Sequence, residues 1–300
     1  MRQESISQEQ AEFFNQNGYL IVRQALDRAE LEAMQAAMER LVAFADKTRP
    51  NDPDYMFRAG HRTGASVLQR IEYVIDKDDT AKALLANPFI LRSVETLQGP
   101  DLIPTWDSMV LKAPGEGIIV PWHRDAGTGG VGDRPIFNVD FYLDRADEEN
   151  CVWVIPGSQA WPTPEVEAWL GEHRDREQSV EEFKSSRAVP AVMEPGDVLF
   201  HNILVLHGSP ATTVNRWRRV VYYEFRPAHV ELERGPHVPE YIPLKQKLLL
   251  ACMRLRCDAA WLPKDERAFQ YLPPAPFNTT ELAPNETLDT YRYAHGDYWR

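Results

Sequence analysis

The sequence predicts a mainly β fold with flanking helices, of the double-stranded β-helix (jelly-roll, cupin-like) type. Short apolar runs alternate with turn residues from about Leu102 to Arg226, and this density of short strands is typical of a jelly roll. Helical patterns precede and follow that stretch. A chain of 300 residues fits one domain of this kind. We therefore expect a single domain over 1–300, with its core at about 102–226 and flanking helices and an extended tail at 1–101 and 227–300.

The segment before the core is expected to be mostly helical. Ser7-Gln-Glu-Gln10 matches a capping box and begins a helix that Asn17-Gly18 ends. The remaining expectations, from periodicity and turn residues, are a strand at 19–23, a helix at 27–44, a loop at 47–63, a strand at 67–74 and two short helices within 79–97.

The core is expected to hold seven short strands and one excursion. Thr163 to about Lys184 is helical and highly charged, which indicates a solvated surface insertion. After the core we expect a helix at 241–257 and an extended tail from Pro263. The expected strands lie at 108–112, 117–122, 136–143, 152–155, 191–193, 197–201 and 219–225.

Charge and composition exclude several classes of function. The net charge of −12 argues against a nucleic acid or an anionic membrane as partner. No stretch of eighteen apolar residues indicates a membrane span, and no signal peptide precedes the first helix. Three cysteines make no disulfide framework. These features predict a cytoplasmic protein; its oligomeric state is left open.

A possible metal site begins at Pro121-Trp-His-Arg-Asp125. On a strand, residues i and i+2 point to the same face, so His123 and Asp125 converge. Two histidines and one carboxylate form the triad that holds non-haem Fe(II) with open positions. The pair alone is a weak signal, because many structural strands contain His-x-Asp. The hypothesis therefore needs a third ligand and a co-substrate anchor.

The third ligand is expected between Pro195-Gly-Asp197 and His207-Gly-Ser209. His207 ends an apolar run at an expected strand end, where a barrel offers side chains to its mouth. The chain between Asp125 and His207 is long enough to leave the sheet and return on a neighbouring strand. His201 competes for the role, but a core or turn histidine bonded to backbone is the commoner explanation for it. We favour His207.

Arg218 and Arg219 open the strand that follows. Adjacent strand residues face opposite ways, so one of the two points inward. A buried arginine is costly without an anionic partner, and the carboxylate of an organic acid bound beside the metal can be a bidentate one. A surface arginine or a structural ion pair is the alternative.

Together these motifs resemble the phytanoyl-CoA dioxygenase family of Fe(II)/2-oxoglutarate-dependent oxygenases. The resemblance covers about Ser7 to Arg226, and it implies the double-stranded β-helix with flanking helices. It is carried by Phe13 to Val22, Trp122-His-Arg-Asp125, Tyr142-Leu-Asp144, Pro156-Gly-Ser158, and Pro195-Gly-Asp197 through Arg219.

The resemblance implies ligands and an activity. Fe(II) is expected to bind His123, Asp125 and His207, and Arg218 to anchor the far carboxylate of 2-oxoglutarate. Two weaker matches, Ser209 and Gln69, are expected to support the same co-substrate. With O2, such an enzyme hydroxylates or otherwise oxidises a C–H bond and releases succinate and CO2.

Further residues refine this expectation. Related halogenases have a small residue in place of the carboxylate ligand, so Asp125 favours hydroxylation. Trp122, Trp153 and Trp106 are candidates for the pocket wall, although core packing is expected for at least two of them.

The sequence also departs from the family pattern. Glu149-Asn150 stands where the family often has Asn-Gly, and Gln159 replaces the final histidine of Pro-Gly-Ser-His. These positions bear on the substrate rather than on iron. No family signature is apparent after about Glu231.

Two other functions remain open at this point. The chain could be a non-catalytic jelly roll that binds a metal or a ligand. Gly127-Thr-Gly-Gly-Val-Gly132 matches the dinucleotide fingerprint G-x-G-x-x-G, but that motif needs a helix after it and a strand is expected here. We expect the glycines to form a loop beside the metal site instead. The sequence does not name the substrate.

Overall fold

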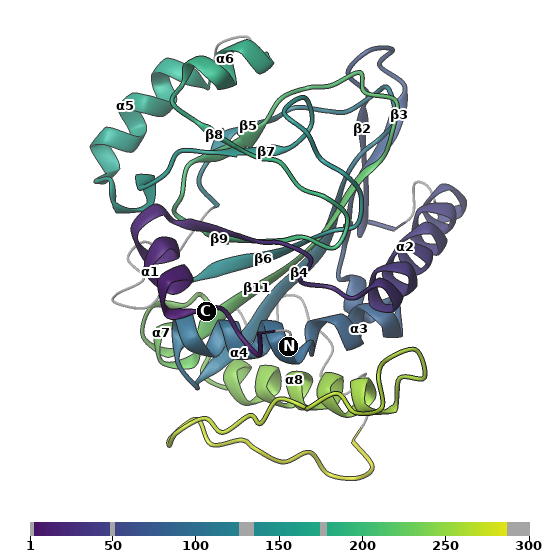
Figure 1. Ribbon diagram of the computed structural model, residues 1–300, viewed down its shortest axis with the longest axis vertical. Coiled ribbons are helices and arrows are strands. Elements are labelled where there is room, and N and C mark those ends of the chain that lie inside the picture. The colour runs from purple at the N-terminus through teal and green to yellow at the C-terminus, as the bar shows by residue number, and fades with distance from the viewer. Residues whose placement is uncertain (1–2, 49–51, 126–134, 175–178, 287–300) are drawn as a thin grey trace.

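Two antiparallel sheets face one another in the computed structural model, which describes residues 3–48, 52–125, 135–174 and 179–286. The two sheets lie face to face (Figure 1), and side chains from both line the cavity that contains the metal-site candidates. The smaller sheet has the order β5 (Val120–His123), β10 (His207–Ser209), β7 (Val152–Val154) and β8 (Val189–Ala191). The larger has the order β1 (Tyr19–Val22), β9 (Val198–Asn202), β6 (Phe137–Tyr142), β11 (Arg218–Pro227), β4 (Leu102–Lys112), β3 (Ser66–Glu72) and β2 (Tyr55–Ala59).

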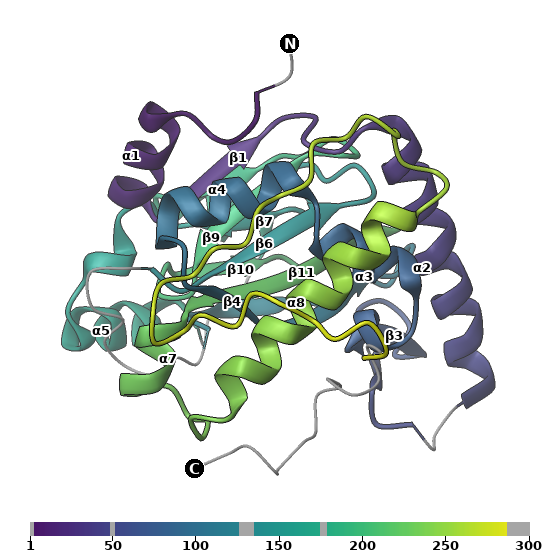
Figure 2. The ribbon, with the colours of Figure 1, turned by 90° about the horizontal axis from the view of Figure 1, so that it is seen from below.

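Helices cover the outer faces of both sheets. Figure 2 shows α3, α4 and α8 across the larger sheet, and Figure 1 shows α5 and α6 beyond the smaller one. The helices are α1 (Gln8–Asn17), α2 (Arg28–Thr48), η1 (Val74–Asp76), α3 (Asp79–Leu85), α4 (Pro88–Gln98), η2 (Ser158–Ala160), α5 (Thr163–His173), α6 (Val180–Ser185), α7 (Ala228–Arg234) and α8 (Tyr241–Asp258).

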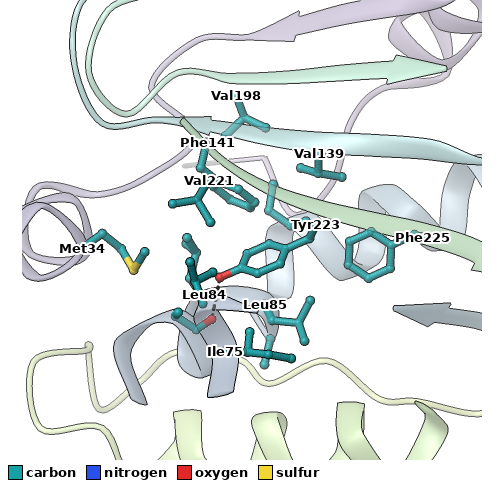
Figure 3. Close-up of a cluster of buried hydrophobic side chains, with 14 of the residues drawn as sticks. Met34, Ile75, Leu84, Leu85, Val139, Phe141, Val198, Val221, Tyr223 and Phe225 are labelled. Carbon is teal, nitrogen blue, oxygen red and sulfur yellow. Dashed lines mark hydrogen bonds between the residues drawn. The ribbon is translucent and has the colours of Figure 1, made fainter. Parts of the chain in front are cut away.

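The main hydrophobic core lies between the larger sheet and these helices (Figure 3). Strand β11 shows how alternation builds it, because Val221, Tyr223 and Phe225 point outward into this core. The Tyr223 hydroxyl donates to the carbonyl of Ala81 at 2.6 Å, which satisfies the one polar group that this side chain buries. The even-numbered residues of β11 point the other way, into the space between the sheets.

The predicted jelly-roll fold class is confirmed, but several elements differ: β10 and α7 were not expected, and the strand expected at 191–193 lies at 189–191. Residues 47–63 were expected to be a loop, but β2 lies within them and pairs with β3 at the sheet edge. Apart from the buried Tyr55, its side chains are half-buried or exposed. The local pattern therefore lacked the apolar signal of a buried strand, and pairing with β3 decides its conformation. The larger sheet also draws β1, β2 and β3 from before Leu102. The glycine stretch 127–132 lies outside the described residues.

In the part of the chain that the structure describes, no helix combines the length and the apolar character needed to cross a bilayer. The capping box predicted at Ser7 is present, and Gly18 ends α1 with a φ of 77°, a left-handed conformation that favours glycine.

Candidate metal centre

Strand pairing brings the two candidate histidines together. His123 at the end of β5 lies opposite His207 at the start of β10, and their ring centroids are 4.2 Å apart. The backbone N–H of Asp125 donates to the carbonyl of Ile203 at 3.0 Å, which holds the carboxylate over the same point. One ligand atom from each of His123, Asp125 and His207 lies within 4.8 Å of the others. Residues distant in sequence thus form one cluster.

Hydrogen bonds set the tautomers of both rings. Nδ1 of His123 lies 2.7 Å from the Pro121 carbonyl, and Nδ1 of His207 lies 3.0 Å from the Val205 carbonyl. A carbonyl oxygen only accepts, so each Nδ1 carries the proton. Each Nε2 then presents its lone pair, as a metal ligand must.

Asp125 is held by a second group of polar residues. Asn138 on β6 donates to its Oδ2 at 2.9 Å, and Nε2 of His201 lies 3.3 Å from the same oxygen. Nδ1 of His201 contacts Oδ2 of Asp140 at 2.8 Å. Oδ2 is therefore engaged, whereas Oδ1 faces His123 and His207 at 3.5 and 3.7 Å.

The charges of these groups suit a cation. Burial and the neighbouring His123 lower the pKa of His207 to about 3, so its imidazole is neutral. Burial would raise the pKa of Asp125, but His207, His123 and His201 outweigh it and hold that pKa well below its usual range. Burial likewise opposes protonation of His201, yet Asp140 and Asp125 raise its pKa to about 10. The centre thus offers the neutral imidazole of His207, the His123 ring and one carboxylate.

Ser158 braces the two segments that carry the ligands. Its hydroxyl accepts from the backbone N–H of Leu206 at 2.7 Å, next to His207. Its carbonyl accepts from Arg124, which stands between His123 and Asp125. The Pro156-Gly-Ser158 turn therefore positions both sides of the centre.

Arg218 and Arg219 face opposite ways, as strand alternation requires. Arg219 forms a bidentate pair with Asp144, with both N–O distances 2.8 Å. Arg218 is 1% exposed and lines the cavity beside the triad. Its Nε and Nη1 are buried and make no hydrogen bond within the described residues. A buried guanidinium without an anion is costly, so these atoms fit the carboxylate of a bound acid.

The sequence also matches one family whose members have this geometry's chemistry. The sequence profile described as Phytanoyl-CoA dioxygenase (PhyH) matches residues 14–220. The chain belongs to the phytanoyl-CoA dioxygenase family. It is thereby an Fe(II)- and 2-oxoglutarate-dependent dioxygenase, which uses Fe(II), 2-oxoglutarate and O2.

Individual relatives are distant. The chain is 23% identical to the peroxisomal phytanoyl-CoA dioxygenase of Rattus norvegicus over 231 residues, which are 72% of this chain and 67% of that protein. It is 28% identical to dioxygenase cdmD of Talaromyces verruculosus over 143 residues, 43% of this chain and 42% of that protein.

Solved structures of similar fold include two informative cases. AviO1 from Streptomyces viridochromogenes Tue57 is 26% identical, with a TM-score of 0.59 over 73% of this chain and 93% of that chain. EctD from S. alaskensis, with 2-oxoglutarate and 5-hydroxyectoine, is 19% identical, with a TM-score of 0.60 over 77% and 79%. At that identity the second likeness shows the jelly-roll fold alone.

A cavity of about 510 Å³ joins the triad to Arg218. Ser209 and Gln69, which were expected to support 2-oxoglutarate, also line this cavity. The Ser209 hydroxyl donates to the Cys151 carbonyl at 2.7 Å, so its single proton is in use. The Gln69 side chain makes no hydrogen bond with the described residues.

Of the three tryptophans considered for the wall, Trp106 lines the cavity. Trp122 and Trp153 are each 2% exposed and pack beneath α5 and α6 instead. Trp122 stacks on Phe183 with centroids 4.6 Å apart. Both tryptophans therefore lie away from the expected wall. Strand alternation explains this, because Trp122 is adjacent to His123 and faces the opposite way.

Sequence reasoning missed several polar groups of the site. Asn138 and Asp140 stand two apart in an otherwise apolar strand, and this alternation is a signal that could have found them. The Tyr142 hydroxyl and Nδ2 of Asn150 are buried without a hydrogen-bond partner in the described chain. No local pattern distinguishes these two from ordinary core residues.

Proposed function

We propose that this dioxygenase hydroxylates, or otherwise oxidises, a C–H bond of a small organic molecule and releases succinate and CO2. Fe(II) is held by His123, Asp125 and His207, and the far carboxylate of 2-oxoglutarate by Arg218. One observation carries the proposal: three convergent ligand atoms share a cavity with the buried Arg218 guanidinium, whose Nε and Nη1 make no hydrogen bond within the described residues.

The residues present fit both absent groups. Two imidazole nitrogens and a carboxylate match the facial triad of non-haem Fe(II). When bound, Fe(II) with 2-oxoglutarate and O2 supplies the oxidation of an unactivated C–H bond. The chain contributes positions: His123 and His207 present lone pairs from fixed tautomers, and Asn138 and His201 orient the Asp125 carboxylate.

Arg218 is assigned to orient the co-substrate by a bidentate pair with its far carboxylate. Gln69, on β3, lines the cavity with an amide that makes no hydrogen bond within the described residues. Ser209 is assigned a supporting role, which requires its hydroxyl to turn from the Cys151 carbonyl. Tyr142 lies opposite Val220, two residues along β11 from Arg218, and its buried hydroxyl has no hydrogen-bond partner in the described chain, so we add it as a further donor.

A substitution of Asp125 tests the assignment. Asp125→Gly is expected to lower succinate formation from 2-oxoglutarate, under Fe(II) and O2, by at least about a hundredfold, because even supporting groups are worth ten- to a hundredfold in metal affinity. Asp265→Gly, at an exposed turn, is the control and should keep its activity. Retained activity in Asp125→Gly, or wild-type protein that binds no 2-oxoglutarate with Fe(II) under anaerobic conditions, would contradict the proposal.

We also propose that the enzyme works in the cytoplasm and that its substrate is neither nucleic acid nor lipid membrane. The supporting observations are the net charge of −12 and three cysteines that form no disulfide.

A further inference from the structure

The half of the cavity away from Arg218 carries polar groups that neither Fe(II) nor 2-oxoglutarate uses. Arg218 and Arg226 both line the cavity and lie at opposite ends of β11. Around Arg226 the lining includes Glu224, Thr105, Trp106 and His237. These residues come from β4, from β11 and from the segment after α7, so the subsite is built by tertiary structure.

Strand register places Glu224 next to the metal centre. Across the larger sheet, Trp106 on β4 lies opposite Glu224 on β11, and Glu224 lies opposite Asn138 on β6. Asn138 in turn lies opposite His201 on β9, and both contact the Asp125 carboxylate. Directly opposed residues have Cβ atoms about 4.5–5.5 Å apart. A molecule held by Glu224 therefore lies one strand from the group that orients a metal ligand.

Glu224 is held rigidly and keeps one oxygen free. Its Oε1 accepts from the Thr105 hydroxyl at 2.5 Å and from Nε of Arg226 at 2.8 Å. Within the described residues its Oε2 makes no hydrogen bond. Its side chain is 15% exposed, and it lines the cavity. Oε2 is thus an available acceptor on a side chain that is fixed through Oε1 and lines the cavity.

Arg226 offers a donor beside that acceptor. Its Nη1 donates to Glu231 at 3.0 Å, and Glu231 also accepts from His237 at 2.8 Å. Nη2 of Arg226 makes no hydrogen bond within the described residues. The free acceptor and the free donor come from side chains that already bond to each other, so they present a paired acceptor–donor site.

We propose that this subsite, formed by Glu224, Arg226 and Trp106, selects a polyhydroxylated substrate; the inference rests on the proposed function. Neighbouring hydroxyl groups donate to Glu224 Oε2 and accept from Arg226 Nη2 together, because a hydroxyl does both. The Trp106 ring supplies an apolar face for the C–H side of a hydroxylated ring. A long acyl chain here would bury both polar groups without partners, which is costly.

The test measures binding in the protein loaded with Ni(II) and 2-oxoglutarate, which cannot turn over. Saturation-transfer NMR compares three probes, methyl β-D-glucopyranoside, hexanoyl-CoA and choline, on the wild type. Glu224→Gln removes the carboxylate but keeps the shape of the side chain. Trp106→Leu removes the aromatic ring and leaves Glu224 in place. Glu233→Gln, at an exposed position on α7, is the matched control.

We expect the glucopyranoside to bind the wild type and Glu233→Gln alike, and to bind Glu224→Gln and Trp106→Leu at least tenfold more weakly. All four proteins should bind 2-oxoglutarate, which shows that they are folded and that the co-substrate site is intact. The inference is overturned if 2-oxoglutarate binds but the glucopyranoside does not. It is also overturned if hexanoyl-CoA or choline binds more tightly, or if neither variant weakens the glucopyranoside. Failure of the wild type to bind 2-oxoglutarate overturns the proposed function itself.

Discussion

His201 and His207 show how single contacts divide two buried histidines between roles. Both nitrogens of His201 lie against carboxylates, Asp140 on one side and Asp125 on the other. Such a ring carries two protons and has no lone pair to offer a metal. In His207 only Nδ1 bonds to a backbone carbonyl, so Nε2 is available to a metal. The environment, rather than the residue type, assigns His207 as the ligand and His201 as its support.

The adjacent arginines give a matched pair for a test at this scale. Arg218→Met is expected to raise the Kd for 2-oxoglutarate by about a hundredfold, since a charge-assisted bidentate bond contributes about 3 kcal/mol. Arg219→Met removes the same charge one residue along the strand, but from the pair with Asp144. It should lower stability and leave the Kd unchanged. Isothermal calorimetry with Ni(II) measures the Kd for 2-oxoglutarate in both variants. Equal losses of affinity would contradict the assignment.

At the scale of elements, β4 joins the larger sheet to the helices outside it. Asp107 on β4 accepts from the backbone N–H of Ile75 at 3.0 Å, and its carbonyl accepts from Tyr73 at 3.0 Å. These bonds attach η1 to the outer face of the sheet. Burial raises the pKa of the Asp107 carboxyl to about 7, with Asp76 and Lys245 as neighbouring charges.

This buried carboxyl predicts a pH effect on stability. Asp107 has a pKa of about 4 when unfolded and about 7 when folded. Between these values the native protein binds more protons, so its stability falls as pH rises from about 4 to about 7. Asp107→Asn keeps an acceptor for Ile75 and does not titrate. Between pH 5 and pH 8 the free energy of unfolding of this variant should rise by roughly 2 kcal/mol relative to that of the wild type. Urea unfolding measures this difference. Parallel profiles for the two proteins would contradict this.

At the scale of the whole molecule, one buried arginine ties distant segments together. Arg256 on α8 donates to Glu30 on α2 at 2.6 Å and to the Ala83 carbonyl on α3 at 2.7 Å. Its remaining nitrogens bond Glu266 in the tail at 2.7 and 2.8 Å. Asn87 donates to the other oxygen of Glu30 at 2.9 Å. The helical layer outside the larger sheet is thus closed by one guanidinium.

Removing the Arg256 guanidinium alone should destabilise the protein more than removing Arg256 and the Glu30 charge together. Arg256→Met leaves the Glu30 carboxylate buried without its cation, which costs about 3–5 kcal/mol. The double variant Glu30→Gln/Arg256→Met removes the stranded charge and should recover part of the loss. Urea unfolding of the single and double variants forms a double-mutant cycle. If Arg256→Met lowers the free energy of unfolding by less than about 1 kcal/mol, then Arg256 does not stabilise the fold through its bonds to Glu30 and Glu266.

The sequence by itself determined the jelly-roll class and the candidate ligands. Strand alternation predicted that His123 and Asp125 converge, although β5 ends at His123 and the bond to the Ile203 carbonyl holds Asp125. The family motifs pointed to His207 and Arg218. These features depend on residues close in sequence or on ordered motifs, so a single chain displays them. The same alternation, applied to Trp122, would have placed it beneath α6 rather than in the pocket wall.

Only the tertiary structure decided which polar residues meet. The row of Trp106, Glu224, Asn138 and His201 crosses four strands that are not in sequence order. Its register is set by long-range pairing, and a slip of one residue would turn every side chain to the other face. For the same reason β2 became a strand against its local pattern. The chain's local signals therefore point to the chemistry, whereas the paired strands determine what surrounds the metal centre.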